Sequence, residues 1–178
     1  MKNYLYLIIR MERWFFYMNL QRLFELQQNL DQHIERNHNL EDESLLSKKV
    51  LALQVELAEL ANETRCFKFW SNKQPSDKKV ILEEFVDCLH FILTIGIEKG
   101  FTDVEVQGRN PQYDIVGQFS NLYIDINDFI VCNSKDHYIT LFEDFLTLGN
   151  SLKFSKEEIE EAYYKKNCVN HERQKVGY

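Results

Sequence analysis

Two pairs of acidic residues lie in separate apolar stretches of the chain, and each pair is spaced three positions apart. The first pair is Glu56 and Glu59, and the second is Glu84 and Asp87. Residues three apart on an α-helix share one face, with Cβ atoms about 5–6 Å apart, so each pair can direct two carboxylates at one point. Burial of these carboxylates is costly unless they are paired or bind a metal. Two such helices in antiparallel contact would form a site for Mg²⁺, with Mn²⁺ as an alternative.

Other interpretations of the acidic residues remain open from the sequence. The pairs could form a solvated acidic stripe, which is the usual role of such spacing on a helix. Glu83 lies four residues before Asp87, and periodicity alone does not decide between Glu83 and Glu84. A di-iron site needs a Glu-x-x-His motif on each of two helices, and only the Asp87–His90 spacing comes near that pattern.

Apolar residues recur at helical spacing along most of the chain, so the sequence predicts an all-α protein. Six Gly and two Pro are too few for an all-β sandwich or barrel. Ser44 is the expected N-cap of the second helix, and Ser155 and Glu158 form an expected capping box before a last helix that should end near Asn167. We expect a helical bundle with the metal site between two antiparallel core helices, 44–66 and 77–99. The other expected helical segments are 19–37, 113–131, 138–149 and 155–167.

Composition restricts the class of protein. The formal net charge of −7 argues against general binding to nucleic acid or to a membrane surface. The four cysteines contain no CxxC pair, so we expect free thiols in a reducing compartment and a cytoplasmic protein. Residues 1–17 hold only a short apolar run, which predicts an N-terminal extension, and residues 18–178 are expected to form a single all-α domain.

Beyond the acidic pairs, several segments resemble a known family. The Glu-x-x-Glu and Glu-x-x-Asp motifs, separated by about two dozen residues, resemble those of the all-α NTP pyrophosphatase superfamily, which includes the MazG-like enzymes. Three further segments are similar to motifs of the dimeric dUTPases: LQQNLD at 26–31, CFKFW at 66–70, and KNCVNHERQKVGY at 166–178. The resemblance covers about residues 20–178. The last segment also gathers cationic and amide donors in an acidic chain, as a polyphosphate site would require.

The resemblance implies hydrolysis of dUTP, with dUDP as a further candidate substrate, to dUMP by a Mg²⁺-dependent homodimer with two or three ions per site. Glu56 or Glu59 would orient the attacking water. The rival hypotheses are a MazG-like pyrophosphatase of another nucleotide and a non-enzymatic protein-interaction module. By resemblance, the metal ligands are Glu56, Glu59, Glu84 and Asp87, the base and sugar are bound by Gln27, Asp31, Trp70, His90 and Phe91, and the phosphates are bound by Lys166, Asn167, Asn170, Arg173 and Tyr178.

Overall fold

The structure is a computed structural model that describes residues 18–40 and 43–177. Its secondary structure in this part of the chain is entirely helical, which confirms the predicted fold class. The expectations for residues 1–17 and for Tyr178 lie outside the described residues. The helices are α2 (Leu20–His38), α3 (Leu46–Thr64), α4 (Lys78–Lys99), α5 (Ile115–Cys132), α6 (Lys135–Ser151) and α7 (Lys156–Lys175).

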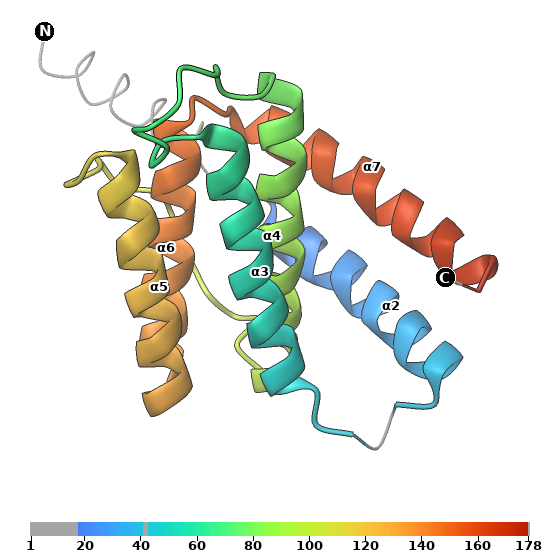
Figure 1. Ribbon diagram of the computed structural model, residues 1–178. Helices are drawn as coiled ribbons and strands as arrows, with labels where there is room; N and C mark the ends of the chain where they lie inside the picture. The colour runs from blue at the N-terminus through green and yellow to red at the C-terminus, as the bar shows by residue number, and fades with distance from the viewer. Residues whose placement is uncertain (1–17, 41–42, 178) are drawn as a thin grey trace, which may run out of the picture.

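Helix α4 lies at the centre of the molecule and contacts α2, α3, α6 and α7 (Figure 1). Helices α3, α4, α5 and α6 run roughly parallel or antiparallel to one another, while α2 and α7 lie obliquely on the other side of α4. α3 and α4 are antiparallel neighbours joined by the segment 65–77, as the sequence predicted. The two acidic motifs are therefore on adjacent core helices.

The hydrophobic core explains why α4 is apolar almost all round. Phe85 of α4 is fully buried and stacks on Phe145 of α6, with ring centroids 4.1 Å apart. Gly149 permits this approach, because a Cβ atom there would lie 2.7 Å from Cζ of Phe85. A helix packed on several sides has little solvated surface, so polar residues that remain on it carry a cost.

The start of α3 differs from the prediction. Ser44 is not the N-cap, since the helix begins at Leu46 and Leu45 occupies the cap position without a side-chain hydrogen bond. The backbone N–H of Leu45 instead donates to Glu98 Oε1 of α4 at 3.1 Å. In a capping box the side chain at the third helical position accepts from the N-cap N–H, and here a glutamate of a neighbouring helix takes that role.

The end of α7 also differs from the prediction. The capping box of Ser155 and Glu158 is present as expected, but the helix continues past Asn167 to Lys175. Its last turns contact α2: the rings of His33 and His171 stack, and the backbone carbonyl of Gln174 accepts a hydrogen bond from a side-chain amide of α2 at 3.2 Å. The sequence predicted an earlier end because the residues after Asn167 lack an apolar stripe, whereas polar contacts with α2 hold them in place.

Candidate functional site

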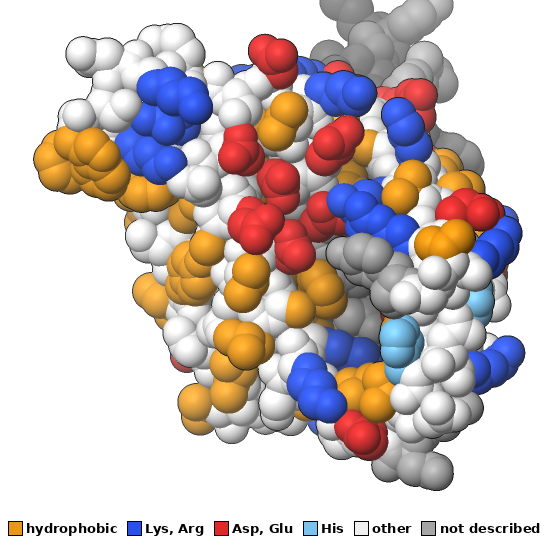
Figure 2. Space-filling view, turned by 45° about the vertical axis from the view of Figure 1, so that its right-hand side comes forward, with side chains coloured by type: hydrophobic (Ala, Val, Ile, Leu, Met, Phe, Trp, Pro, Cys, Tyr) orange, Lys and Arg blue, Asp and Glu red, His pale blue; other side chains and the backbone are white. Residues whose placement is uncertain are grey.

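Three of the four predicted metal ligands come together between α3 and α4. Each of Glu56, Glu84 and Asp87 has a carboxylate oxygen within 4.8 Å of those of the other two. Acidic side chains gather at the centre of this face, with basic side chains beside them (Figure 2). Glu59 is exposed and lies outside the group of three, one turn further along α3. Of the alternatives on α4, Glu84 belongs to the group, while Glu83 is exposed and does not.

The charges in this cluster oppose one another. Burial, with the charges of Asp87, Glu59 and Glu84, raises the pKa of Glu56 to about 7. Burial and the charge of Asp87 likewise raise the pKa of Glu84. The site therefore carries more negative charge than it can stabilise alone, and its donors are all carboxylate oxygens. Hard divalent cations such as Mg²⁺ prefer such donors, so the residues present fit the predicted cofactor.

One lysine partly compensates the cluster. Nζ of Lys166, on α7, lies 2.5 Å from Oδ2 of Asp87. Burial raises the pKa of Asp87, and the hydrogen bond and charge of Lys166 oppose that rise, as does the charge of Arg173. The predicted phosphate-binding helix thus places its cations directly beside the predicted metal ligands.

A pocket of about 360 Å³ adjoins the cluster. Asp87 lines this pocket and also belongs to the carboxylate group, so the two features are continuous. A pocket of this size suits a small-molecule ligand such as a nucleoside. Its lining includes five other residues that the sequence assigned to the site, from α2, α4 and α7: Gln27, Asp31, His90, Phe91 and Asn170.

A buried hydrogen-bond network forms one wall of the pocket. Gln27 Nε2 donates to Asp31 Oδ1 at 2.7 Å, and Gln27 Oε1 faces Nδ1 of His90 at 2.6 Å. The hydroxyl of Tyr163 donates to the same oxygen at 2.8 Å, and Thr94 donates to Asp31 Oδ2. His90 Nε2 has no hydrogen-bond partner in the described part of the chain. The network therefore links α2, α4 and α7 through polar groups that have little access to solvent.

Sequence reasoning missed two members of this network. Thr94 lies four residues after His90, and Tyr163 lies four residues before Asn167. That spacing places each on the same helical face as a predicted site residue, and it was the only available signal. Tyr163 also stacks on His90, with ring centroids 4.3 Å apart. Aromatic residues at such positions are usually ordinary core residues, so spacing alone did not identify Tyr163 as a site residue.

The predicted phosphate-binding residues occupy different environments on α7. Asn170 lines the pocket, and Arg173 is exposed near the end of the helix. Asn167 is buried, and its amide nitrogen lies 3.5 Å from the backbone oxygen of Leu26. This contact joins α7 to α2, so Asn167 positions the helix in this structure.

Trp70 does not join the other predicted base-binding residues within the chain. It is 65% exposed and makes edge contacts with the rings of Phe67 and Phe69. The pocket touches α3 at Ala52, whereas Trp70 follows the C-terminal end of that helix. At 1.5 Å per residue, Thr64 is already about 18 Å beyond Ala52 along the axis. Trp70 was assigned to the base by resemblance alone, and it does not line the pocket of this chain.

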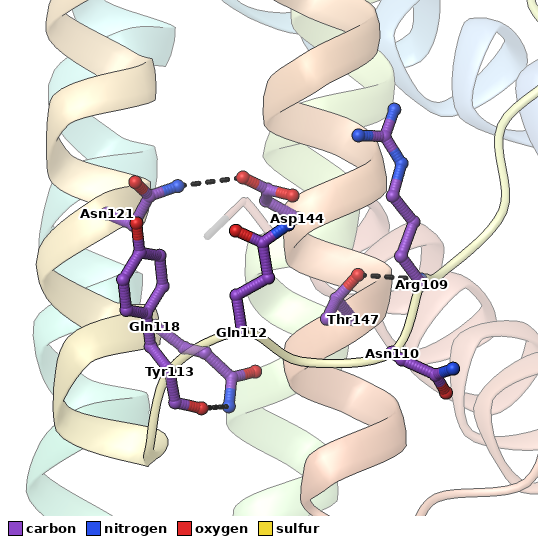
Figure 3. A pocket seen from close by; sticks show the side chains of 8 residues that line it. All are labelled: Arg109, Asn110, Gln112, Tyr113, Gln118, Asn121, Asp144 and Thr147. Atoms are coloured by element: carbon purple, nitrogen blue, oxygen red, sulfur yellow. Dashed lines mark hydrogen bonds between the residues drawn. The ribbon is translucent and has the colours of Figure 1, made fainter.

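A second, smaller pocket of about 200 Å³ lies where α5 and α6 meet the loop 109–113 (Figure 3). The side-chain amide of Asn121 donates to Asp144 at 2.7 Å and to Asp125 at 3.0 Å. Burial and the neighbouring carboxyl of Asp144 raise the pKa of Asp125 to about 7. The lining of this pocket contains no residue that the sequence assigned to the site.

Comparison with known proteins gives the family of the chain. A protein-family model described as dUTPase matches residues 19–178, and a search of curated proteins found no match. In the described residues, no helix has the length and apolar character needed to cross a membrane. The match covers nearly the whole chain and agrees with the all-helical fold. The chain therefore belongs to the helical dUTPase family, the dUTP diphosphatases.

Proposed function

We propose that the chain hydrolyses dUTP to dUMP and pyrophosphate in a Mg²⁺-dependent reaction at the α3–α4 carboxylates. The observation that carries this proposal is the continuity of two features: three carboxylates with oxygens within 4.8 Å open through Asp87 into a pocket of about 360 Å³. A nucleoside bound in the pocket would have its 5′-phosphates beside the carboxylates. The same site could take dUDP, which differs from dUTP by one phosphate.

The proposed metal ligands are the three clustered carboxylates together with Glu59. The raised pKa of Glu56 reflects charge that a cation would relieve. When bound, two or three Mg²⁺ ions, or Mn²⁺ in their place, supply positive charge that neutralises the triphosphate. Glu59 is exposed next to these three carboxylates and is not a member of their cluster. Its carboxylate is thus available to orient the attacking water and to accept its proton, a role for which Glu56 is the alternative.

The proposed role of α7 is to bind the phosphate chain. Lys166 pairs with Asp87 in the structure described, and a phosphate oxygen would offer its ammonium group a second anionic partner. Arg173, two turns further on the same helix, can bind two oxygens at once. Asn170 lines the pocket between them, and Tyr178 is proposed as a further contact on the basis of the family motif. Charge-assisted bonds of this kind position the phosphorus for attack.

The proposed base site is the polar wall of the pocket. Gln27 and His90 supply hydrogen-bonding groups for a pyrimidine edge, and Phe91 supplies an apolar surface. Asp31 lies one turn from Gln27 and lines the same pocket. Polar groups set beside apolar side chains such as Leu30 and Ile34 are typical of a site that selects its ligand by orientation.

We further propose that the chain forms a homodimer through the outer faces of α3 and α5. These helices are neighbours, and their outward faces expose a stripe of aliphatic side chains: Leu51 (61%), Val55 (48%), Ile124 (56%) and Val131 (80%). Exposed apolar side chains on two adjacent helices suit a self-complementary interface between two copies. Ile124→Glu should convert the dimer to a monomer in analytical ultracentrifugation, and a wild-type monomer would refute the proposal.

The test of the proposed reaction is a nucleotide screen with pyrophosphate release as the readout. Wild-type protein with Mg²⁺ is assayed against dUTP and the four canonical deoxynucleoside triphosphates. We expect dUTP to give the highest kcat/KM, Asp87→Asn to be inactive, and the exposed Glu161→Gln control to match wild type. Preference for another nucleotide would favour the MazG-like alternative, and inactivity on all of them would refute the enzymatic proposal.

A further inference from the structure

The Gln27 amide can in principle present either of two faces to a ligand. Its nitrogen donates and its oxygen accepts, and a rotation of 180° exchanges them. We propose that Tyr163 and Asp31 are positioning residues that hold this amide with its nitrogen as the group left for the base. The pocket then selects a pyrimidine with a carbonyl at that edge over one with an amino group. This inference rests on the proposed function and adds its basis of selectivity.

The oxygen of the amide is already saturated. Gln27 Oε1 accepts a hydrogen bond from the Tyr163 hydroxyl at 2.8 Å and lies 2.6 Å from Nδ1 of His90. Burial raises the pKa of Tyr163, so its hydroxyl stays protonated. A carbonyl oxygen has two lone pairs, and both are used within the protein.

The nitrogen of the amide is fixed by the carboxyl group of Asp31, which accepts its hydrogen bond. Gln27 Nε2 donates to Asp31 Oδ1 at 2.7 Å, and Thr94 donates to the other carboxylate oxygen. Burial raises the pKa of Asp31, and the two hydrogen bonds and the charge of Lys49 oppose that rise. Rotation of the amide would bring its oxygen against the carboxylate oxygen. This contact between two oxygens disfavours the rotated form whenever Asp31 is ionised.

The orientation of the Gln27 amide determines which ring nitrogen of His90 carries the proton. Burial, followed by the charge of Lys166, lowers the pKa of His90 to about 3, so the ring is neutral and carries one proton. With Gln27 Oε1 opposite Nδ1, that proton lies on Nδ1, and Nε2 keeps a lone pair. Nε2 has no partner in the described residues. The stacked ring of Tyr163 holds the imidazole in this plane.

Two hydrogen-bonding groups of the network therefore remain for a ligand. They are the second hydrogen of Gln27 Nε2, a donor, and Nε2 of His90, an acceptor. Uracil offers a ring carbonyl and the adjacent imide N–H, which complement one donor and one acceptor. Cytosine offers an amino group and an unprotonated ring nitrogen in those places, so both contacts fail. Unmet polar groups at a buried site are what give large discrimination between similar ligands.

The test compares two buried tyrosine hydroxyls. Tyr163→Phe keeps the ring that stacks on His90 and removes the bond to Gln27. Tyr138→Phe is the matched control, because its buried hydroxyl donates to the backbone oxygen of Ile92 at 3.0 Å. For each protein, kcat and KM are measured with dUTP and with dCTP. We expect Tyr163→Phe to lower the dUTP to dCTP ratio of kcat/KM by about fivefold, the worth of one neutral hydrogen bond, mainly through KM. The control should keep the wild-type ratio.

A second substitution removes the acceptor-only constraint. In Asp31→Asn the new amide can rotate together with Gln27, so the ratio should fall by about tenfold or more. The ¹⁵N shifts of His90 provide a readout independent of turnover: the proton should lie on Nδ1 in wild type and be shared between the two nitrogens in Asp31→Asn.

Each outcome bears on a separate claim. Folded Tyr163→Phe and Asp31→Asn proteins with the wild-type ratio and an unchanged His90 tautomer would overturn the positioning role. A wild-type protein that fails to hydrolyse dUTP would instead refute the proposed function, while the ¹⁵N measurement would still test the network. If either variant does not fold, Thr94→Val and Thr94→Ser replace it. A lower dUTP to dCTP ratio of kcat/KM in Thr94→Val but not in Thr94→Ser would support the proposal. The same ratio in both variants would overturn it.

Discussion

Removal of the Glu56 charge should stabilise the metal-free protein at alkaline pH. Burial and three neighbouring carboxylates raise the pKa of this side chain from 4.5 to about 7. A carboxyl whose pKa is raised in the folded state destabilises that state when it ionises. The penalty is absent below about pH 4.5 and complete above about pH 7, so wild-type stability should fall between pH 5 and pH 8.

The magnitude follows from the same values. A rise from 4.5 to about 7 corresponds to about 3 kcal/mol before any screening. Glu56 is only half-buried, and solvent screening reduces the figure to about 1–2 kcal/mol. For a protein of this length, that corresponds to a change in Tm of about 3–6 °C. Glu56→Gln, which cannot ionise, should therefore melt that much higher than wild type at pH 8 and at about the same temperature at pH 5.

The assay is a thermal melt in EDTA at pH 5 and pH 8. The exposed Glu161→Gln control removes one negative charge from α7 and should show no difference between the two pH values relative to wild type. If Glu56→Gln melts below wild type at pH 8, ionised Glu56 does not destabilise the metal-free fold. The same conclusion follows if the difference in Tm between the two proteins is equal at both pH values.

Three further predictions concern other parts of the molecule. Lys166→Met removes the ammonium group beside Asp87 and should lower kcat/KM for dUTP by about 10-fold to 100-fold, since a charge-assisted bond contributes about 1.5–3 kcal/mol; steady-state kinetics would contradict this if turnover stayed within about twofold of wild type. Asp125→Asn should raise Tm at pH 8 but not at pH 5, because burial and a neighbouring carboxyl raise the pKa of Asp125 to about 7, and equal Tm changes at both pH values would count against that pair. Gly96→Ala would place a Cβ atom 2.7 Å from Cζ of Tyr138 and should lower the free energy of unfolding by about 1–3 kcal/mol, measured in urea, where an unchanged midpoint would show that the core can adjust.

Helical periodicity predicted the helices and the convergence of Glu56, Glu84 and Asp87, because both depend on local spacing. Two facts were enough to predict that the motifs at Glu56 and Glu84 meet. One is the spacing of residues on a single helix, and the other is the antiparallel pairing of two helices that are consecutive in sequence. Periodicity could not separate Glu83 from Glu84, since both can share a face with Asp87 and the choice depends on which neighbour packs against α4.

Features that depend on contacts distant in sequence were not predictable in the same way. α7 extends to Lys175 because its polar side chains contact α2, more than a hundred residues earlier. The start of α3 relies on Glu98 for the same reason. Tyr163 resembled an ordinary core residue until the structure placed its hydroxyl on Gln27. Trp70 was assigned by resemblance alone, and the loop that carries it lies away from the pocket.

The proposed reaction is Mg²⁺-dependent cleavage of dUTP between its α- and β-phosphates at the carboxylates of α3 and α4. The most direct measurement follows dUTP by ³¹P NMR with wild-type protein in Mg²⁺, with the same sample after EDTA, and with Asp87→Asn in Mg²⁺. We expect dUMP and pyrophosphate as the products in the first sample and unchanged dUTP in the other two. Release of inorganic phosphate and dUDP, or turnover that survives EDTA or the substitution, would contradict it.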